Sequence, residues 1–147
     1  MSRLTRPLLF ASSEECEHAF YEALDSGDAA AIAELWLEDD DVVCVHPGGP
    51  RLTGHGPVRA SWAAILSNGP LHVRSTSRKS LDTPTVAVHN VVEEVLVTEG
   101  RERHIARVVA TNAFVKTGAG WKMVLHHASS VPDGEAASFD EAHGVLH

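Results

Sequence analysis

Three turn signals in the second half of the chain constrain its fold more than any other feature of the sequence. They fall at Asp82-Thr83-Pro84, at Glu99-Gly100 and at Gly118-Ala119-Gly120. Asp, Pro and Gly break extended segments, so these turns divide a stretch rich in Val, Thr, Ile and His into four predicted strands. We expect the strands at residues 71–80, 85–98, 102–116 and 121–130. Because the connecting turns are short, consecutive strands are predicted to run antiparallel, as a meander.

The first half of the chain carries helix signals instead. Ser12 opens a capping-box pattern before a helix predicted at residues 13–26, which Gly27 ends. Asp28 caps a second predicted helix, and Pro57 suits the first turn of a third. Between the second and third helices, residues 42–45 predict a short strand, and a second short run follows it.

Helices followed by a meander are typical of an α+β fold. We expect a curved antiparallel sheet with an apolar face, wrapped around the three N-terminal helices as a half-open cone. At 147 residues the chain forms one domain, predicted at residues 13–132. Residues 1–12 are expected to be an N-terminal extension, and residues 133–147 a polar tail.

The charge balance argues against two classes of partner. The net charge is −8, and no cluster of Lys and Arg is longer than two adjacent residues. A protein that neutralises phosphates needs a basic face, so we expect no nucleic acid and no anionic membrane surface as partner. No stretch approaches the roughly 20 apolar residues of a membrane span, and the apolar run near the start is short for a secretory signal. We therefore expect a cytoplasmic protein whose Cys16 and Cys44 are reduced.

The histidines do not form a metal-binding pattern. The chain has ten of them, including the adjacent pair His126 and His127. Neighbouring residues of a strand point to opposite faces of the sheet, so one ion would not easily take both side chains. No HxxxH spacing falls on a predicted helix, and no CxxC spacing occurs. We expect neither a metal nor a cofactor.

The order of the elements resembles the nuclear transport factor 2-like superfamily, and more narrowly its SnoaL-like branch. The matching pieces are "CVHPGG", "LTG", "VRASWAAIL" and "TNAFVKTGAGWKMVLHHAS". The last piece also resembles the association (hub) domain of the calcium/calmodulin-dependent kinases. The resemblance covers roughly residues 13–132 and implies a cystatin-like α+β barrel with a deep apolar pocket. It also implies a homodimer through the convex outer face of the sheet. It does not imply an activity, because isomerases, dehydratases, cyclases, carriers and hubs share this fold.

Strand alternation divides the candidate residues between the two faces of the sheet. On the last strand, Trp121 and Met123 are the bulkier apolar set, which places His127 inside the cone and His126 outside. On the preceding strand, Asn112 and Phe114 are expected to face inward. The kinase hub carries a pocket arginine where this chain has Asn112, so the resemblance does not extend an anionic site to that residue.

Seven side chains are candidates for a pocket. The predicted ligand-binding residues are Trp36, His46, Trp62, Asn112, Phe114, Trp121 and His127. For His46 the alternatives are a pocket residue at the mouth of the cone or a histidine that merely ends a strand before Pro47. The three Trp residues are more often core than ligand contacts, and one of them is expected to line the cavity.

The residues leave open whether the protein is an enzyme. General acid–base catalysis needs a carboxylate and a His or Tyr with separated pKa values. The candidates are His127, His46 and Glu93, with Asp41 as a second carboxylate. Glu93 and Glu94 are adjacent, so one of them should reach the interior. The sequence favours a domain that binds a small, mostly apolar molecule, with an isomerase, dehydratase or cyclase and a non-catalytic dimeric scaffold as alternatives.

Overall fold

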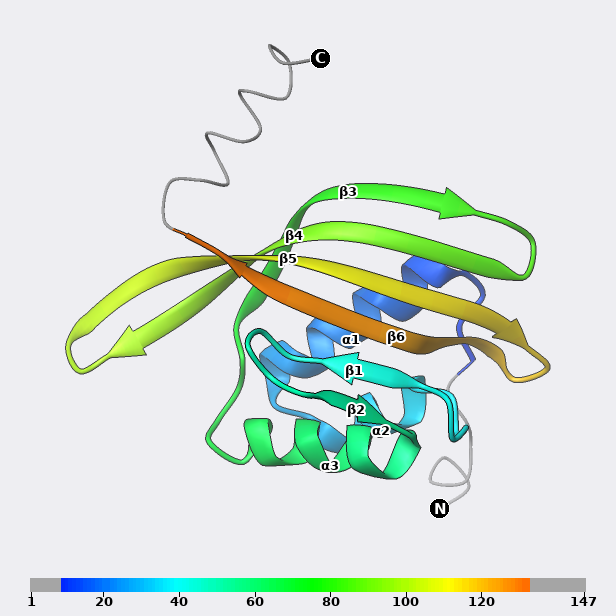
Figure 1. Cartoon of the computed structure of the whole chain (residues 1–147), viewed down its shortest axis with the longest axis horizontal. Coiled ribbons are helices and arrows are strands. Elements are labelled where there is room, and N and C mark those ends of the chain that lie inside the picture. Colours follow the sequence, from blue (N-terminus) through cyan, green and yellow to red (C-terminus); the bar gives the residue numbers. More distant parts are fainter. Residues whose placement is uncertain (1–8, 133–147) are drawn as a thin grey trace, which may run out of the picture.

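The computed structural model describes residues 9–132, which form three helices and one six-stranded sheet (Figure 1). The helices are α1 (Ser13–Ser26), α2 (Ala29–Leu35) and α3 (His55–Leu66). The strands are β1 (Val43–Val45), β2 (Arg51–Thr53), β3 (Val73–Asp82), β4 (Val86–Glu99), β5 (Glu102–Thr117) and β6 (Gly120–Val131). The helices cover one face of the curved sheet, which confirms the predicted α+β architecture.

The helix ends follow from the residues that the sequence supplies there. Ser12 Oγ accepts a hydrogen bond from the Glu15 amide at 3.1 Å, which satisfies one of the donors that an α-helix leaves unpaired at its start. Gly27 ends α1 in the left-handed region, with φ 72°. That conformation suits glycine because it has no Cβ. The side chain of Asp28 then caps α2 in the same way as Ser12 caps α1.

The strands occur in the order β2-β1-β6-β5-β4-β3, and the sheet does not close. The four strands β3 to β6 form the predicted antiparallel meander. One pairing differs from an antiparallel sheet, because β1 lies parallel to β6. β1 comes between two helices and joins the far edge of the meander, where β2 pairs with it on its other side.

A β-bulge in β6 makes the predicted orientation of the two histidines wrong. Met123 pairs with Phe114 and Leu125 pairs with Ala113, which leaves Val124 as the extra residue. An extra residue shifts the alternation of the strand by one position. Trp121 and Met123 therefore face the core as expected, but beyond the bulge His126 is buried and His127 is exposed.

The core lies between the helices and the inner face of the sheet. Its largest fully buried side chains include Phe20, Trp36, Phe114 and Met123. Cys16 and Cys44 are both buried and free, so the structure holds them as two separate thiols. None of the helices in residues 9–132 combines the length and the apolar character needed to cross a membrane. Most of the predicted extension and the whole predicted tail fall outside the described residues.

Candidate active site

An apolar cavity of about 230 Å³ lies between the inner face of the sheet, α1, α3 and the turn that follows β1. Its walls are mostly aliphatic, with side chains such as Leu24, Ile65 and Val95. Three ionisable side chains reach this lining, and they are His46, Glu93 and His126. Binding sites of proteins commonly have this composition, an apolar wall with a few convergent polar groups.

Glu93 is the carboxylate of the cavity. It points inward from β4 and is 6% exposed, whereas Glu94 points to the other face, where it pairs with Arg74 and Arg107. Tyr21 on α1 donates a hydrogen bond of 2.6 Å to Glu93 Oε2. Burial raises the pKa of Glu93 to about 7, and the bond from Tyr21 opposes that rise. A carboxyl group with a pKa near neutrality can both take and return a proton.

His126 is the buried imidazole of the cavity. Its ring is 3% exposed and lies 5.3 Å from the ring of Phe20 and 5.6 Å from that of Trp62. Its Nδ1 is 2.6 Å from Asn112 Oδ1. Burial lowers the pKa of His126 to about 3, so the imidazole is neutral throughout the physiological range.

Asn112 connects these two cavity groups to the first helix. Its Nδ2 is 3.0 Å from Glu17 Oε2 and 3.1 Å from the Tyr21 hydroxyl. Asn112 is fully buried, so its amide needs partners inside the protein, and the three contacts supply them. The result is one polar network between α1 and the inner face of the sheet, in which Tyr21 leads to Glu93 and Asn112 leads to His126.

Glu17 is the charged end of that network. Burial opposes its ionisation, but the contacts with His89 and Asn112 and the charge of Arg78 outweigh that effect, and the pKa of Glu17 lies below its ordinary value. Its Oε2 lies 3.0 Å from His89 Nδ1, close enough for electrostatic attraction although the geometry is not that of a hydrogen bond. Arg78 Nη1 lies 3.5 Å from Glu17 Oε1. Glu17 is therefore a buried carboxylate that remains ionised.

His46 sits at the edge of the cavity. Its ring meets Trp62 edge-on at 4.6 Å, and its Nε2 lies 3.0 Å from Ser61 Oγ. Partial burial lowers the pKa of His46, so this imidazole is also neutral at pH 7. Of the two interpretations of His46, the structure supports a position on the pocket rim.

The SnoaL-like domain model matches residues 14–134 of this chain. The chain belongs to the SnoaL-like domain family. No protein with a curated description matches it. Many solved structures share its fold.

Two of those structures share more than a quarter of their aligned residues with this chain. One is a Streptomyces avermitilis protein described as a proposed dehydratase of the nuclear transport factor 2-like family. It is 36% identical to this chain, the match covers 79% of this chain and 91% of the other, and the TM-score is 0.72. A Thiobacillus denitrificans protein, described as a proposed association domain of calcium/calmodulin-dependent protein kinase type II, is 27% identical over 84% of this chain and 98% of its own, with a TM-score of 0.76. A Caulobacter vibrioides protein with a cystatin-like fold, 18% identical over 86% of this chain and 92% of its own with a TM-score of 0.70, supports the fold alone.

The structure of this SnoaL-like domain brings some of the predicted site residues together and separates others. His46, Trp62 and Glu93 line the cavity. Asn112 lies one hydrogen bond behind it, while Trp36, Phe114 and Trp121 are buried in the core and absent from its lining. His127 is exposed, and so is Asp41.

Sequence reasoning missed Glu17, His126 and the role of Tyr21. His126 was assigned to the wrong face because nothing in the sequence marks the bulge at Val124. Glu17 and Tyr21 did leave a signal. They are four residues apart on α1 and share a face with the core residue Leu24, so polar groups with helical spacing interrupt an apolar stripe.

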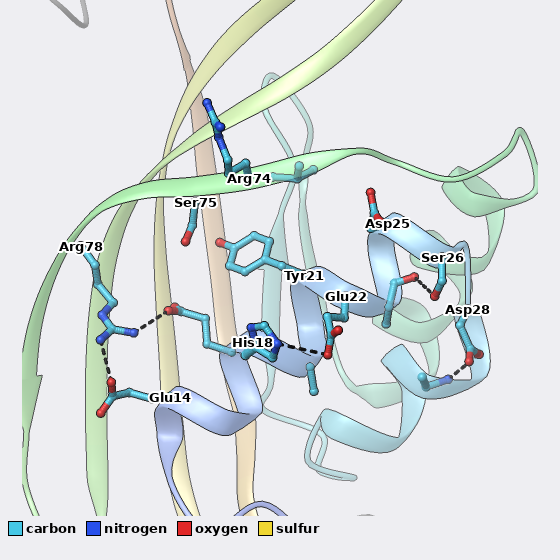
Figure 2. A pocket seen from close by; sticks show the side chains of 15 residues that line it. Glu14, His18, Tyr21, Glu22, Asp25, Ser26, Asp28, Arg74, Ser75 and Arg78 are labelled. Atoms are coloured by element: carbon cyan, nitrogen blue, oxygen red, sulfur yellow. Dashed lines mark hydrogen bonds and ion pairs between the residues drawn. The ribbon is translucent and has the colours of Figure 1, made fainter.

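A larger groove on the SnoaL-like domain is a weaker candidate site. It has a volume of about 720 Å³ and lies between α1 and β3 (Figure 2). Most of its charged groups pair with one another, for example Arg78 with Glu14 at 2.8 Å and His18 with Glu22 at 3.2 Å. Within residues 9–132, including this groove, no group of three or more His, Cys, Asp or Glu side chains could hold a metal ion.

Proposed function

We propose that this SnoaL-like domain is an acid–base enzyme that moves a proton on a small, mostly apolar substrate. The observation that supports this function is Glu93, a carboxyl group with a pKa of about 7 inside an otherwise apolar cavity. A general base works best when its pKa lies near the working pH, and burial is the usual way to tune a glutamate to that range.

The arrangement fits removal of a proton beside an electron-withdrawing group. Glu93 accepts the proton from carbon, while Tyr21 holds the carboxylate in one position through its hydrogen bond. In a dehydration, the proton then leaves with the substrate hydroxyl as water and a carbon–carbon double bond forms. In an isomerisation, the proton returns to a second carbon. The relative from Streptomyces avermitilis, described as a proposed dehydratase, favours the first reaction.

Ligand binding without chemistry and a purely structural scaffold are the alternatives. A scaffold needs no cavity, and a pocket that only binds an apolar body needs no carboxyl group, whose burial costs solvation energy. The buried Glu93 therefore favours catalysis over both.

A β-hydroxy ketone of matching size tests the proposal. The protein is incubated with hydroxyindanone, and formation of the conjugated indenone is followed by ultraviolet absorbance. We expect the wild-type protein to accelerate the loss of water, and Glu93→Gln to reduce the rate at least 100-fold, the lower end of the usual contribution of a general base. Asp41→Asn, which removes an exposed carboxylate away from the cavity, is the control. Equal rates for wild type and Glu93→Gln would exclude Glu93 as the base.

We also propose that two copies of the domain associate through the outer face of the sheet. Leu81, Val88, Ala113 and Leu125 are paired neighbours on four successive strands, so they form one apolar row across that face. Leu81 is 77% exposed in the single chain. A second copy that covers this row would remove its apolar surface from water.

A further inference from the structure

We infer that the cavity selects ligands that carry hydrogen-bond donors, because with Glu93 ionised the polar network leaves only acceptors on the side chains that line it. This inference rests on the proposed function, in that it names the substrate class for the same site. It concerns binding, so it can be tested separately from catalysis. The inference depends on which atoms of the network carry hydrogens, and each position follows from the neighbouring group.

The orientation of the Asn112 amide is the first step. Glu17 is ionised and accepts hydrogen bonds without donating them, so the Asn112 atom 3.0 Å from it must be the amide nitrogen. The second amide hydrogen points to the Tyr21 oxygen, 3.1 Å away. The carbonyl oxygen of Asn112 is then fixed on the side of His126.

That orientation determines the tautomer of His126. A carbonyl oxygen only accepts, so His126 Nδ1, 2.6 Å away, must donate to it. A neutral imidazole carries one hydrogen, and here Nδ1 holds it. The other ring nitrogen, Nε2, keeps an unused lone pair and makes no hydrogen bond to any of residues 9–132. Nε2 can therefore accept a hydrogen bond but cannot donate one.

The same reasoning gives the opposite tautomer for His46. Ser61 has one hydroxyl hydrogen and donates it to the Val58 carbonyl at 3.0 Å. His46 Nε2, 3.0 Å from the same hydroxyl, must then be the donor. The hydrogen of neutral His46 sits on Nε2, and Nδ1 is left as an acceptor.

Neither Tyr21, which bonds to Glu93, nor Trp62, which lines the cavity, adds a donor to it when Glu93 is ionised. The hydroxyl hydrogen of Tyr21 is used by Glu93 Oε2. The indole N–H of Trp62 is enclosed by protein, beside the thiol of Cys44. The residues that line the cavity therefore hold a carboxylate and two imidazole lone pairs, which accept hydrogen bonds.

A ligand that satisfies these acceptors carries a hydroxyl or N–H group on an apolar body and has no negative charge. A cavity of about 150 Å³ lined by apolar groups can bind benzene, so about 230 Å³ has room for a bicyclic body. An ether or an anion of the same shape leaves the acceptors unpaired or repels Glu93, and a buried polar group without a partner is costly.

Direct observation of the tautomers tests the first half of the inference. Long-range proton–nitrogen correlation spectra of protein labelled with ¹⁵N in histidine distinguish the protonated from the unprotonated ring nitrogen. We expect the Nδ1-H tautomer for His126 and the Nε2-H tautomer for His46. An Nε2-H tautomer at His126 would overturn the inference, whatever the catalytic results.

A pair of matched ligands tests the second half. Naphthol and its methyl ether differ in that a methyl group replaces the hydroxyl hydrogen. Their dissociation constants are measured by calorimetry at about pH 8, where Glu93 is mostly ionised and naphthol keeps its hydroxyl hydrogen. We expect naphthol to bind the wild-type protein at least tenfold more tightly than the ether. Equal affinities would overturn the inference.

The variant His126→Asn separates the imidazole from the rest of the cavity. An asparagine amide can still donate to Asn112, but its carbonyl oxygen does not occupy the position of Nε2, so the preference for naphthol should fall severalfold. His127→Asn, on the exposed neighbour, should keep the full preference. If naphthol is preferred but hydroxyindanone is not dehydrated, the inference stands and the proposed enzyme function fails. If the ketone is dehydrated but naphthol is not preferred over its ether, the proposed enzyme function stands and the inference fails.

Discussion

The Tyr21 hydroxyl donates a 2.6 Å hydrogen bond to Glu93 Oε2, and it thereby links the first helix to the fourth strand across 72 positions of sequence. Two effects meet at this carboxyl group. Burial raises its pKa, and the hydrogen bond from Tyr21 lowers it. Tyr21 also accepts a hydrogen bond from Asn112, so a single phenol bridges the two halves of the buried network.

Replacing Tyr21 with Phe should destabilise the protein and raise the pKa of Glu93 further. The change leaves Glu93 and one Asn112 hydrogen without a partner, and a buried unsatisfied group costs about 1–3 kcal/mol. Urea unfolding measures the loss of stability, and carbon-13 NMR of the glutamate side chains measures the pKa. An unchanged or lower Glu93 pKa in Tyr21→Phe would contradict the role assigned to the phenol.

Glu93 and His126 should give the folded protein two opposite pH dependences. Glu93 has a pKa of about 7 when folded against an ordinary 4.5, so the stability it contributes is complete below pH 4.5 and is lost as the pH rises to about 7. His126 has a pKa of about 3 against 6.5, so its contribution is present above pH 6.5 and is lost as the pH falls to about 3. Between pH 4.5 and 6.5 the two slopes oppose each other.

The variant Glu93→Gln should expose the slope that His126 contributes. Between pH 4.5 and 6.5, the free energy of unfolding of the wild type minus that of Glu93→Gln should decrease with rising pH. The decrease is up to about 1.4 kcal/mol per pH unit for one proton. Urea titrations at several pH values measure it. A difference that stays constant across the window would show that the Glu93 pKa is the same in the folded and unfolded protein.

Removing the charge of Arg78 should raise the pKa of Glu17 without unfolding the domain. Arg78 contacts both Glu14 and Glu17 but is partly exposed, so we expect Arg78→Met to cost less than about 1 kcal/mol. Arg74→Met is the matched control, since Arg74 pairs with Glu94 on the other face of the sheet. A rise in the Glu17 pKa that is equal in both variants would show that Arg78 has no specific role.

Both thiols should be unreactive in the folded protein. Cys16 and Cys44 are buried, and burial raises the pKa of each to about 12, so almost no thiolate forms at neutral pH. We expect a colorimetric disulfide reagent to modify neither thiol in buffer and both in denaturant. The intact mass without reductant should match two free thiols. Rapid modification in buffer would show that one of the sites opens in the native state.

The dimer proposal predicts a specific response to added charge. Light scattering should give twice the mass of the chain for the wild-type protein. Val88→Lys, within the apolar row, should give a single-chain mass because it places a charge in the contact. Ala63→Lys adds the same charge to the exposed surface of α3 and should leave the dimer intact. A single-chain mass for the wild-type protein would exclude the proposal.

The bounds of the strands were predictable because turn residues mark them locally. Asp82, Gly100 and Gly120 lie at or next to strand ends in the structure, within two residues of the positions expected from the sequence. The alternation of β5 was predictable as well, since Asn112 and Phe114 are fully buried on the inner face. Both features depend on neighbouring residues in one continuous segment.

The candidate site was less predictable because its contacts join distant segments. Asn112 donates a hydrogen bond to Glu17, which lies 95 positions earlier in the sequence, and no local sequence pattern predicts such a pair. The choice between Glu93 and Glu94 depended on the strand register, which hydrogen bonding to β3 and β5 determines. The orientation of the last strand beyond Met123 depended on a single unpaired residue.

The bulge at Val124 has a consequence for how errors in folding would affect the site. β6 carries His126 and His127 side by side, and the extra residue decides which one enters the interior. A misfolded strand that paired without the bulge would bury His127 in place of His126. An imidazole would still occupy the inner face, but opposite Ala110 instead of Asn112, so the bulge is what places a histidine beside the amide that fixes its tautomer.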